Sequence, residues 1–129
     1  VGQDSTLYDD APELIDNSMA ALDSIIRVAA NKNVTVIGVI FPQSPAYKKT
    51  GAFGRYGMRR SLAKKVIQRI DDLMRVYSNF VLWDANQMGD HDFDDDMATD
   101  YDHLCSEGAV RLSLKLDSLI TAIEKRNSR

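Results

Sequence analysis

Val34-Thr-Val-Ile-Gly-Val-Ile-Phe41 is the stretch of sequence that decides the fold of this chain of 129 residues. Its residues are β-branched or apolar on both alternating faces, which is typical of a strand covered on both sides. Pro42 and Pro45 follow and stop the strand. The run is much shorter than the roughly 20 apolar residues of a membrane-spanning helix, so the sequence predicts no membrane span.

A helix is predicted before this strand. Asp10 can act as its N-cap, Pro12 suits the first turn, and Glu13 stands in the capping-box position. One apolar face follows at alternating spacings of four and three residues: Ile15, Met19, Leu22, Ile26 and Ala29. The pattern predicts a helix that ends near residues 31–33.

The second half of the chain repeats this alternation of helix and strand. A helical period returns with Leu62, Val66, Ile70, Leu73 and Tyr77, and Asn79–Trp83 is predicted to form a short second strand that ends at Asp84. Ser106 can then cap a third helix. Its apolar stripe is Ala109, Leu112, Leu116, Leu119 and Ile123.

The predicted order is αβαβα, which indicates an α/β fold with two parallel strands and flanking helices. The length suits one domain spanning residues 1–129. Two strands, however, give the helices little sheet to cover, and the strand 34–41 would keep one edge unpaired. We therefore expect the chain to be part of a larger α/β sheet, or to complete its sheet with a second copy of itself.

The charges are segregated along the chain, although the net charge is only -3. Residues 48–70 contain eight Lys or Arg and no acid, whereas residues 76–110 contain nine Asp or Glu and no Lys or Arg. The basic residues of the second helix are predicted to form its solvated face, so no nucleic-acid partner is expected. The one cysteine, Cys105, excludes an internal disulfide and is predicted to be a small core residue.

Active sites of open α/β sheets lie at the carboxyl ends of the strands, so function is expected around residues 42–45 and 84–86. The strongest local signal is Asp100-Tyr-Asp-His103-Leu104. An Asp three residues before a His, in a turn, can fold its carboxylate onto the imidazole, fix the tautomer and stabilise imidazolium. The alternative is an ordinary turn in which Asp100 caps backbone amides. No cofactor is predicted.

Asp100-x-x-His103-Leu104, followed by Gly108-Ala109 and an amphipathic last helix, resembles the closing block of SGNH (GDSL-type) hydrolases. The resemblance extends over the order of elements from Asp10 to Lys125, and is greatest to the branch that acts on acylated polysaccharides. It implies part of a flavodoxin-like three-layer sandwich and an exported, periplasmic or extracellular, protein. The family's Gly-Asp-Ser nucleophile block is absent from the sequence, and Asp4 stands where its Gly-x-Asn block would end.

The resemblance implies the C-terminal half of an esterase or acyl-transfer domain that acts on an acylated carbohydrate or similar ester. His103 would take a proton from a serine outside this sequence, and Asp100 would hold His103. This chain alone is then expected to be inactive. The alternative is a non-catalytic binding or interaction module that retains the fold, with both residues as structural remnants.

Four residues after the first strand are candidates for substrate binding: Ser44, Tyr47, Phe53 and Tyr56. The aromatic residues stand among glycines and cations in the loop 46–58, which could form a lid or a carbohydrate-stacking surface, although aromatic loops also simply pack. Ser44 lacks the glycine neighbours of a nucleophile elbow and is predicted to be a turn residue.

The run Asp90-His-Asp-Phe-Asp-Asp-Asp96 has the alternate carboxylates with which a calcium loop begins. Such a loop needs Gly at its sixth position and Glu at its twelfth, where this sequence has Asp95 and Tyr101. The sequence therefore predicts no metal site but a solvated acidic loop, with His91 at the surface. A weak divalent-cation site is the alternative.

Overall fold

The computed structural model describes residues 10–55 and 57–128 and has the predicted αβαβα order. Helix α1 (Pro12–Ala30) leads into strand β1 (Val36–Ile40), and α2 (Arg60–Val76) leads into β2 (Phe80–Asp84). Helix α3 (Ser106–Asn127) closes the described chain. Three short 3-10 turns lie in the connections: η2 (Pro45–Lys49), η3 (Gln87–Gly89) and η4 (Asp95–Met97). The prediction of a mixed helix and strand fold is confirmed.

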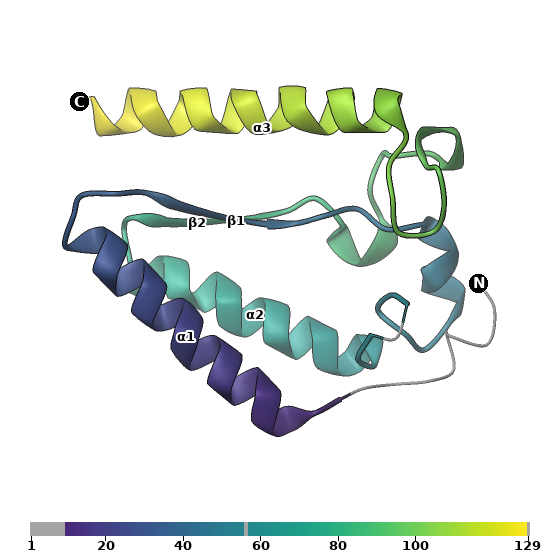
Figure 1. The fold of residues 1–129 in the computed structure, drawn as a ribbon, viewed down its shortest axis with the longest axis horizontal. Coiled ribbons are helices and arrows are strands. Elements are labelled where there is room, and N and C mark those ends of the chain that lie inside the picture. Colours follow the sequence, from purple (N-terminus) through teal and green to yellow (C-terminus); the bar gives the residue numbers. More distant parts are fainter. Residues whose placement is uncertain (1–9, 56, 129) are drawn as a thin grey trace.

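The two strands are parallel and in register, from Val36 opposite Phe80 to Ile40 opposite Asp84. Helix α3 lies along one face of this ribbon, and α1 and α2 lie along the other (Figure 1). The connection from β1 through α2 to β2 is the crossover that parallel strands require. It brings the carboxyl ends of both strands to the same end of the sheet, where the long loops lie (Figure 1).

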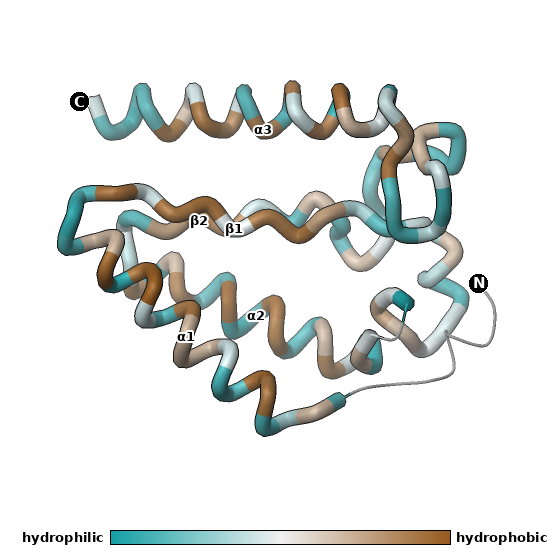
Figure 2. The backbone as a smooth tube through the Cα atoms, viewed as in Figure 1, coloured by the Kyte–Doolittle hydropathy of each residue, from teal (hydrophilic) through white to brown (hydrophobic). Residues whose placement is uncertain are grey.

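The core lies between these layers and is small. Its largest fully buried side chain among the described residues is Ile26 of α1, and Phe80 of β2 and Ile123 of α3 are also buried. Both strands are mostly hydrophobic along the tube (Figure 2). Because the described sheet has only two strands, every residue of β1 is half-buried rather than buried. Helices lie on both faces of the strand, as predicted, and the unpaired edge is the one that the sequence leads us to expect.

Large apolar side chains are exposed next to both ends of β1 and on the helices α1 and α3. Val34 and Phe41 flank β1, Ile25 and Val28 lie on α1, and Val110 and Leu114 lie on α3; each is at least 50% exposed. Isolated exposed apolar residues are ordinary, but here they occur on both helical layers and beside both ends of the strand between them.

Two predicted helix caps are wrong. Helix α1 begins at Pro12 without a side-chain cap, because the Asp10 carboxylate instead bonds the Arg59 backbone amide and Nε, each at 3.0 Å. Helix α3 begins at Ser106 itself, with Cys105 as the N-cap residue and no side-chain cap. Cys105 is half-buried, so its placement in the core is also wrong.

Candidate functional site

The carboxyl ends of β1 and β2 are joined by a network of hydrogen bonds. The backbone amide of Ala85 donates to the Ile40 carbonyl at 3.0 Å, and the backbone amide of Gln43 donates to the side-chain Oδ1 of Asn86 at 2.9 Å. Asn86 is only 2% exposed, and its backbone amide donates to the Asp84 carboxylate at 2.9 Å. The segments that follow the two strands therefore form one fixed base beneath the candidate site.

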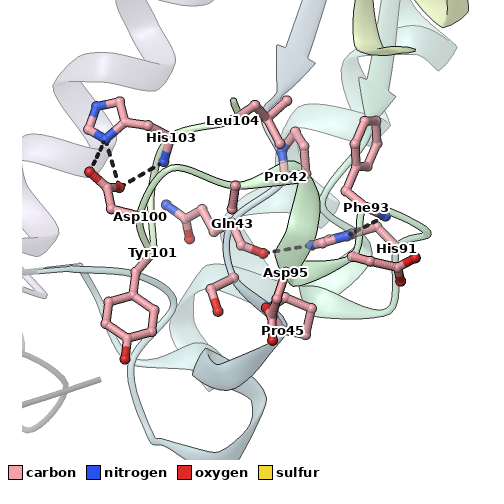
Figure 3. A pocket seen from close by; sticks show the side chains of 13 residues that line it. Pro42, Gln43, Pro45, His91, Phe93, Asp95, Asp100, Tyr101, His103 and Leu104 are labelled. Carbon is pink, nitrogen blue, oxygen red and sulfur yellow. Dashed lines mark hydrogen bonds and ion pairs between the residues drawn. The ribbon is translucent and has the colours of Figure 1, made fainter. Parts of the chain in front are cut away.

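Asp100 and His103 form the pair that the sequence predicts. The imidazole Nδ1 of His103 lies 2.8 Å from Oδ1 and 3.0 Å from Oδ2 of Asp100 (Figure 3). Because Nδ1 faces a carboxylate, it carries the ring proton and leaves Nε2 as the basic nitrogen. The side chain of His103 is 73% exposed and that of Asp100 is 45% exposed. A proton acceptor in fixed orientation thus lies at the surface of the molecule.

The Asp100 carboxylate also organises the backbone of its own turn. Its Oδ1 accepts hydrogen bonds from the amides of Asp102 at 2.8 Å and His103 at 3.0 Å. The Asp102 amide and the His103 side chain hold the pKa of Asp100 below its usual value. The carboxylate is therefore ionised at neutral pH and can stabilise an imidazolium on His103. It also caps amides, so both interpretations of this turn from the sequence describe real contacts.

The turn is closed at its base and attached to the segment after β1. Ala98 and Leu104 form an isolated antiparallel bridge, and the Thr99 amide donates to the His103 carbonyl at 2.8 Å. The Ser44 amide donates to the Tyr101 carbonyl at 2.8 Å. The pair is thereby held beside the carboxyl end of the sheet, as expected for an open α/β fold.

Two hollows adjoin the turn. A small pocket (Figure 3) has a volume of about 10 Å³, which is room for about one water molecule. It is lined by residues 42–45, 91, 93–95, 98, 100–101 and 103–104. A more open hollow of about 380 Å³ is lined by Ser44, Ala46, Asp95 and residues 98–101. Ser44 and Asp100 border both, and the larger hollow has room for part of a small-molecule substrate.

The four candidate substrate-binding residues are placed differently. Ser44 is buried at the start of η2, where its Oγ accepts from the Ala46 amide at 3.2 Å, so it is the turn residue that the sequence predicts. Tyr47 is only 4% exposed and presents no ring face for stacking. Phe53 is half-buried in the loop bridged by Ala52 and Arg59 and does not line either hollow. Tyr56 lies outside the described residues.

His91 is a structural residue, contrary to the expectation of a surface histidine. Its Nε2 lies 2.6 Å from the Gln43 carbonyl, and its Nδ1 accepts from the Phe93 amide at 3.2 Å (Figure 3). These partners use both ring nitrogens, because a carbonyl needs a donor and an amide needs an acceptor. His91 therefore holds the acidic loop against the segment after β1.

Gln43 lies in the segment 42–45 where the sequence leads us to expect function, but it is not among the site residues predicted from the sequence. Its side chain lines the small pocket, and its Oε1 is the buried side-chain oxygen or nitrogen for which the described residues offer no hydrogen-bond partner. Gly54 lies so close that a Cβ there would come within 2.6 Å of the Gln43 amide group. The position of Gln43 directly after Pro42, at the end of the strand, is the signal in the sequence that places it near the site.

The acidic loop divides its carboxylates among different partners. Asp90 pairs with Lys48, while Asp92 bonds Lys115 at 2.8 Å and pairs with Arg111. These cations hold the pKa of both carboxyls below the usual value, with the bond to Lys48 as the main cause for Asp90 and the bond to Lys115 for Asp92. Within residues 10–55 and 57–128, no group of three or more potential ligands could hold a metal ion.

The basic stretch is also paired rather than only solvated. Lys48 reaches Asp90 in the acidic stretch, and Arg69 bonds Asp16 of α1 at 2.9 Å. Arg60 donates to the Met88 carbonyl at 2.6 Å. Arg59, Lys64, Lys65 and Arg69 are exposed, so the predicted solvated face of the second helix is confirmed, while Arg60 is half-buried.

No protein-family model, no curated protein and no solved structure matches this chain. Among the helices in the described part of the chain, none combines the length and the apolar composition needed to cross a membrane.

Proposed function

We propose that this chain supplies the Asp–His half of the catalytic machinery in an SGNH-hydrolase-like domain with a flavodoxin-like three-layer sandwich. The substrate would be an acylated carbohydrate or a similar ester. The observation that carries the proposal is the Asp100 carboxylate within 2.8 and 3.0 Å of His103 Nδ1, with His103 exposed at the carboxyl end of the sheet.

In this mechanism His103 Nε2 takes the proton from a serine hydroxyl as the oxygen attacks the ester carbonyl, and later returns it to the leaving alcohol. Asp100 orients the ring and stabilises the imidazolium. The sequence has no Gly-Asp-Ser, so the serine must come from polypeptide outside these 129 residues. The larger hollow, of about 380 Å³, would accept part of the substrate next to the pair.

The test is ester hydrolysis by a protein in which the upstream polypeptide precedes this chain. With an acetylated oligosaccharide as substrate, His103→Ala should lower kcat by about a thousandfold or more, because the general base is lost. Asp23→Asn is a matched control, since Asp23 bonds Tyr77 between α1 and α2 and has no place in the mechanism. Hydrolysis that survives His103→Ala would remove the pair from the mechanism.

The second candidate is a non-catalytic binding or interaction module. The absence of a Gly-Asp-Ser block from the sequence favours it. Under this alternative the upstream polypeptide would also lack such a block, and the longer protein would show no ester hydrolysis. Binding of the same oligosaccharide without turnover, measured by calorimetry, would identify the module.

The proposal also assigns the open edge of β1 to the remainder of the parent protein. The unpaired edge supports this, because Val36–Ile40 lacks the prolines and charges that keep strands apart, and the exposed apolar residues Val34 and Phe41 flank it. In the longer protein, the amides of Val36–Ile40 should exchange with solvent much more slowly than in this chain alone. A concentration-dependent dimer of this chain in sedimentation velocity would instead favour a second copy as the partner.

A further inference from the structure

Asp102 lies between the two members of the proposed pair and connects them to a buried part of the molecule. Its Oδ1 accepts a hydrogen bond from the hydroxyl of Tyr47 at 3.1 Å, and its Oδ2 lies 3.1 Å from Nε of Arg55. Each carboxylate oxygen therefore has its own donor, which fixes the orientation of the side chain.

The backbone of Asp102 is bonded to the catalytic pair at the same time. Its amide donates to Oδ1 of Asp100 at 2.8 Å, the same oxygen that lies 2.8 Å from His103 Nδ1. Residue 102 thus bonds Asp100 through its backbone and Tyr47 through its side chain. The contact with Tyr47 therefore limits the movement of the residue whose amide donates to Asp100.

The turn needs such an attachment because the pair itself is exposed. The side chain of His103 is 73% exposed, whereas that of Asp102 is 19% exposed and Tyr47 as a whole is 4% exposed. The ring of Tyr47 also packs edge-on against Tyr101, with centroids 6.2 Å apart. Two successive residues of the turn therefore rest on one buried side chain, and hydrogen bonds in such partly buried surroundings are stronger than at the surface.

The protonation state of Tyr47 suits this role. Burial, followed by the neighbouring Asp102 carboxylate, raises the pKa of the phenol above its usual value. The hydroxyl is therefore a hydrogen-bond donor throughout the pH range in which an esterase would work.

We propose that Tyr47 and Asp102 are positioning residues that hold Asp100 and His103 in their reactive geometry, with Arg55 as the second donor to Asp102. This inference rests on the proposed function for its catalytic consequence. It assigns a role to Tyr47 other than substrate stacking, and it makes the η2 segment part of the site's support.

The chain offers a matched control for this inference. Tyr77, at the end of α2, donates its hydroxyl to Oδ1 of Asp23 at 2.6 Å. Tyr47→Phe and Tyr77→Phe therefore each remove one tyrosine–aspartate hydrogen bond across a similar separation in sequence, of 55 and 54 residues. Only the first removes a bond to the turn that carries the pair.

The first measurement is made by NMR on the protein without any substrate. Tyr47→Phe should shift the ¹⁵N resonance of His103 Nδ1 towards that of a free imidazole and raise the pKa of Asp100 towards its ordinary value, because the imidazole and the Asp102 amide would spend less time on the carboxylate. Tyr77→Phe should leave both unchanged. The inference is overturned if Tyr47→Phe moves neither signal, or if the two variants move them equally.

The second measurement uses the protein with its upstream polypeptide. Tyr47→Phe should lower kcat about ten- to a hundredfold with little change in KM. This is the loss expected when a catalytic group is displaced by up to about 1 Å. Asp102→Asn keeps an acceptor for Tyr47 and should lose less activity than Asp102→Ala. Equal losses from both substitutions would contradict the positioning role.

The two proposals fail in different ways. A longer protein that hydrolyses no ester would count against the proposed function, while the NMR comparison would still decide whether Tyr47 and Asp102 hold the pair. A longer protein with full activity in the Tyr47→Phe variant would overturn the positioning role and leave the proposed function intact.

Discussion

The two histidines of this chain lie in the same acidic stretch, yet the structure uses them in opposite ways. In His91, Nε2 is hydrogen-bonded to the Gln43 carbonyl and Nδ1 accepts a hydrogen bond from the Phe93 backbone amide. In His103, Nδ1 is hydrogen-bonded to the Asp100 carboxylate, and the side chain is 73% exposed. Chemistry at an imidazole needs an accessible nitrogen, so the difference separates a structural histidine from a candidate base.

The difference comes from the partner each histidine has. A carboxylate three residues away can orient His103 from within a single exposed turn, whereas His91 acquires its carbonyl partner 48 residues away, through the packing of the acidic loop on the end of β1. Local geometry orients His103 through Nδ1 alone, whereas tertiary packing gives partners to both ring nitrogens of His91.

The largest effect should come from detaching the turn that carries His103. Gly108 in the first turn of α3 lies so close to the Met97 carbonyl that a Cβ would come within 2.4 Å of its oxygen. Gly108→Ala should lower the free energy of unfolding by about 3 kcal/mol, the upper part of the range for overpacking. Urea denaturation measures it, with Ser113→Ala on the exposed face of α3 as control. Unchanged stability would show that this approach is not tight.

His91→Ala tests the structural side of the comparison. It leaves a carbonyl and an amide without partners in a partly buried site, so the free energy of unfolding should fall by about 2 kcal/mol. His103→Ala removes an exposed side chain and should change stability by less than about 0.5 kcal/mol. Thermal denaturation of both variants measures the contrast, and equal losses would erase the distinction between the two residues.

Acid should weaken the His103 turn in a way that depends on Asp100. The pKa of Asp100 lies below its usual value because the Asp102 amide and His103 bind the carboxylate. Its contribution to stability is therefore present above the ordinary aspartate pKa and is lost as the pH falls through the lowered value. The stability advantage of the wild type over Asp100→Asn should shrink between about pH 5 and pH 2. An advantage that is constant with pH would contradict the shift.

The smallest effect is expected at the ion pairs of the His91 loop. The Asp92 side chain is 54% exposed although it faces Lys115 and Arg111. Asp92→Asn should therefore lower the free energy of unfolding by less than about 1 kcal/mol, and high salt should reduce the difference further. Asp117→Asn, elsewhere on α3, is the control in the same denaturation series. A loss that salt does not change would point to packing rather than charge.

Elements that a local pattern defines agree with the structure. The apolar residues of 34–41 predict a strand, which is observed at Val36–Ile40, and the helical period of residues 62–77 is observed as Arg60–Val76. Predicted helix ends agree less well. Asp10 and Ser106 have the chemistry of N-caps, but Asp10 finds Arg59 in the folded chain and Ser106 is already helical. A cap depends on competition with partners that are distant in sequence.

The sequence by itself determined the αβαβα order and the pairing of Asp100 with His103. Periodicity fixes which residues form helices and strands, and three residues of a turn are enough to bring a carboxylate onto an imidazole. Only the tertiary structure decided that both ring nitrogens of His91 have partners, that Gln43 lines the pocket, and that Tyr47 bonds Asp102. The contacts that Gln43 and Tyr47 make join residues some 40 to 55 positions apart, so they exist only after β1 and β2 have paired and brought their loops to one end of the sheet.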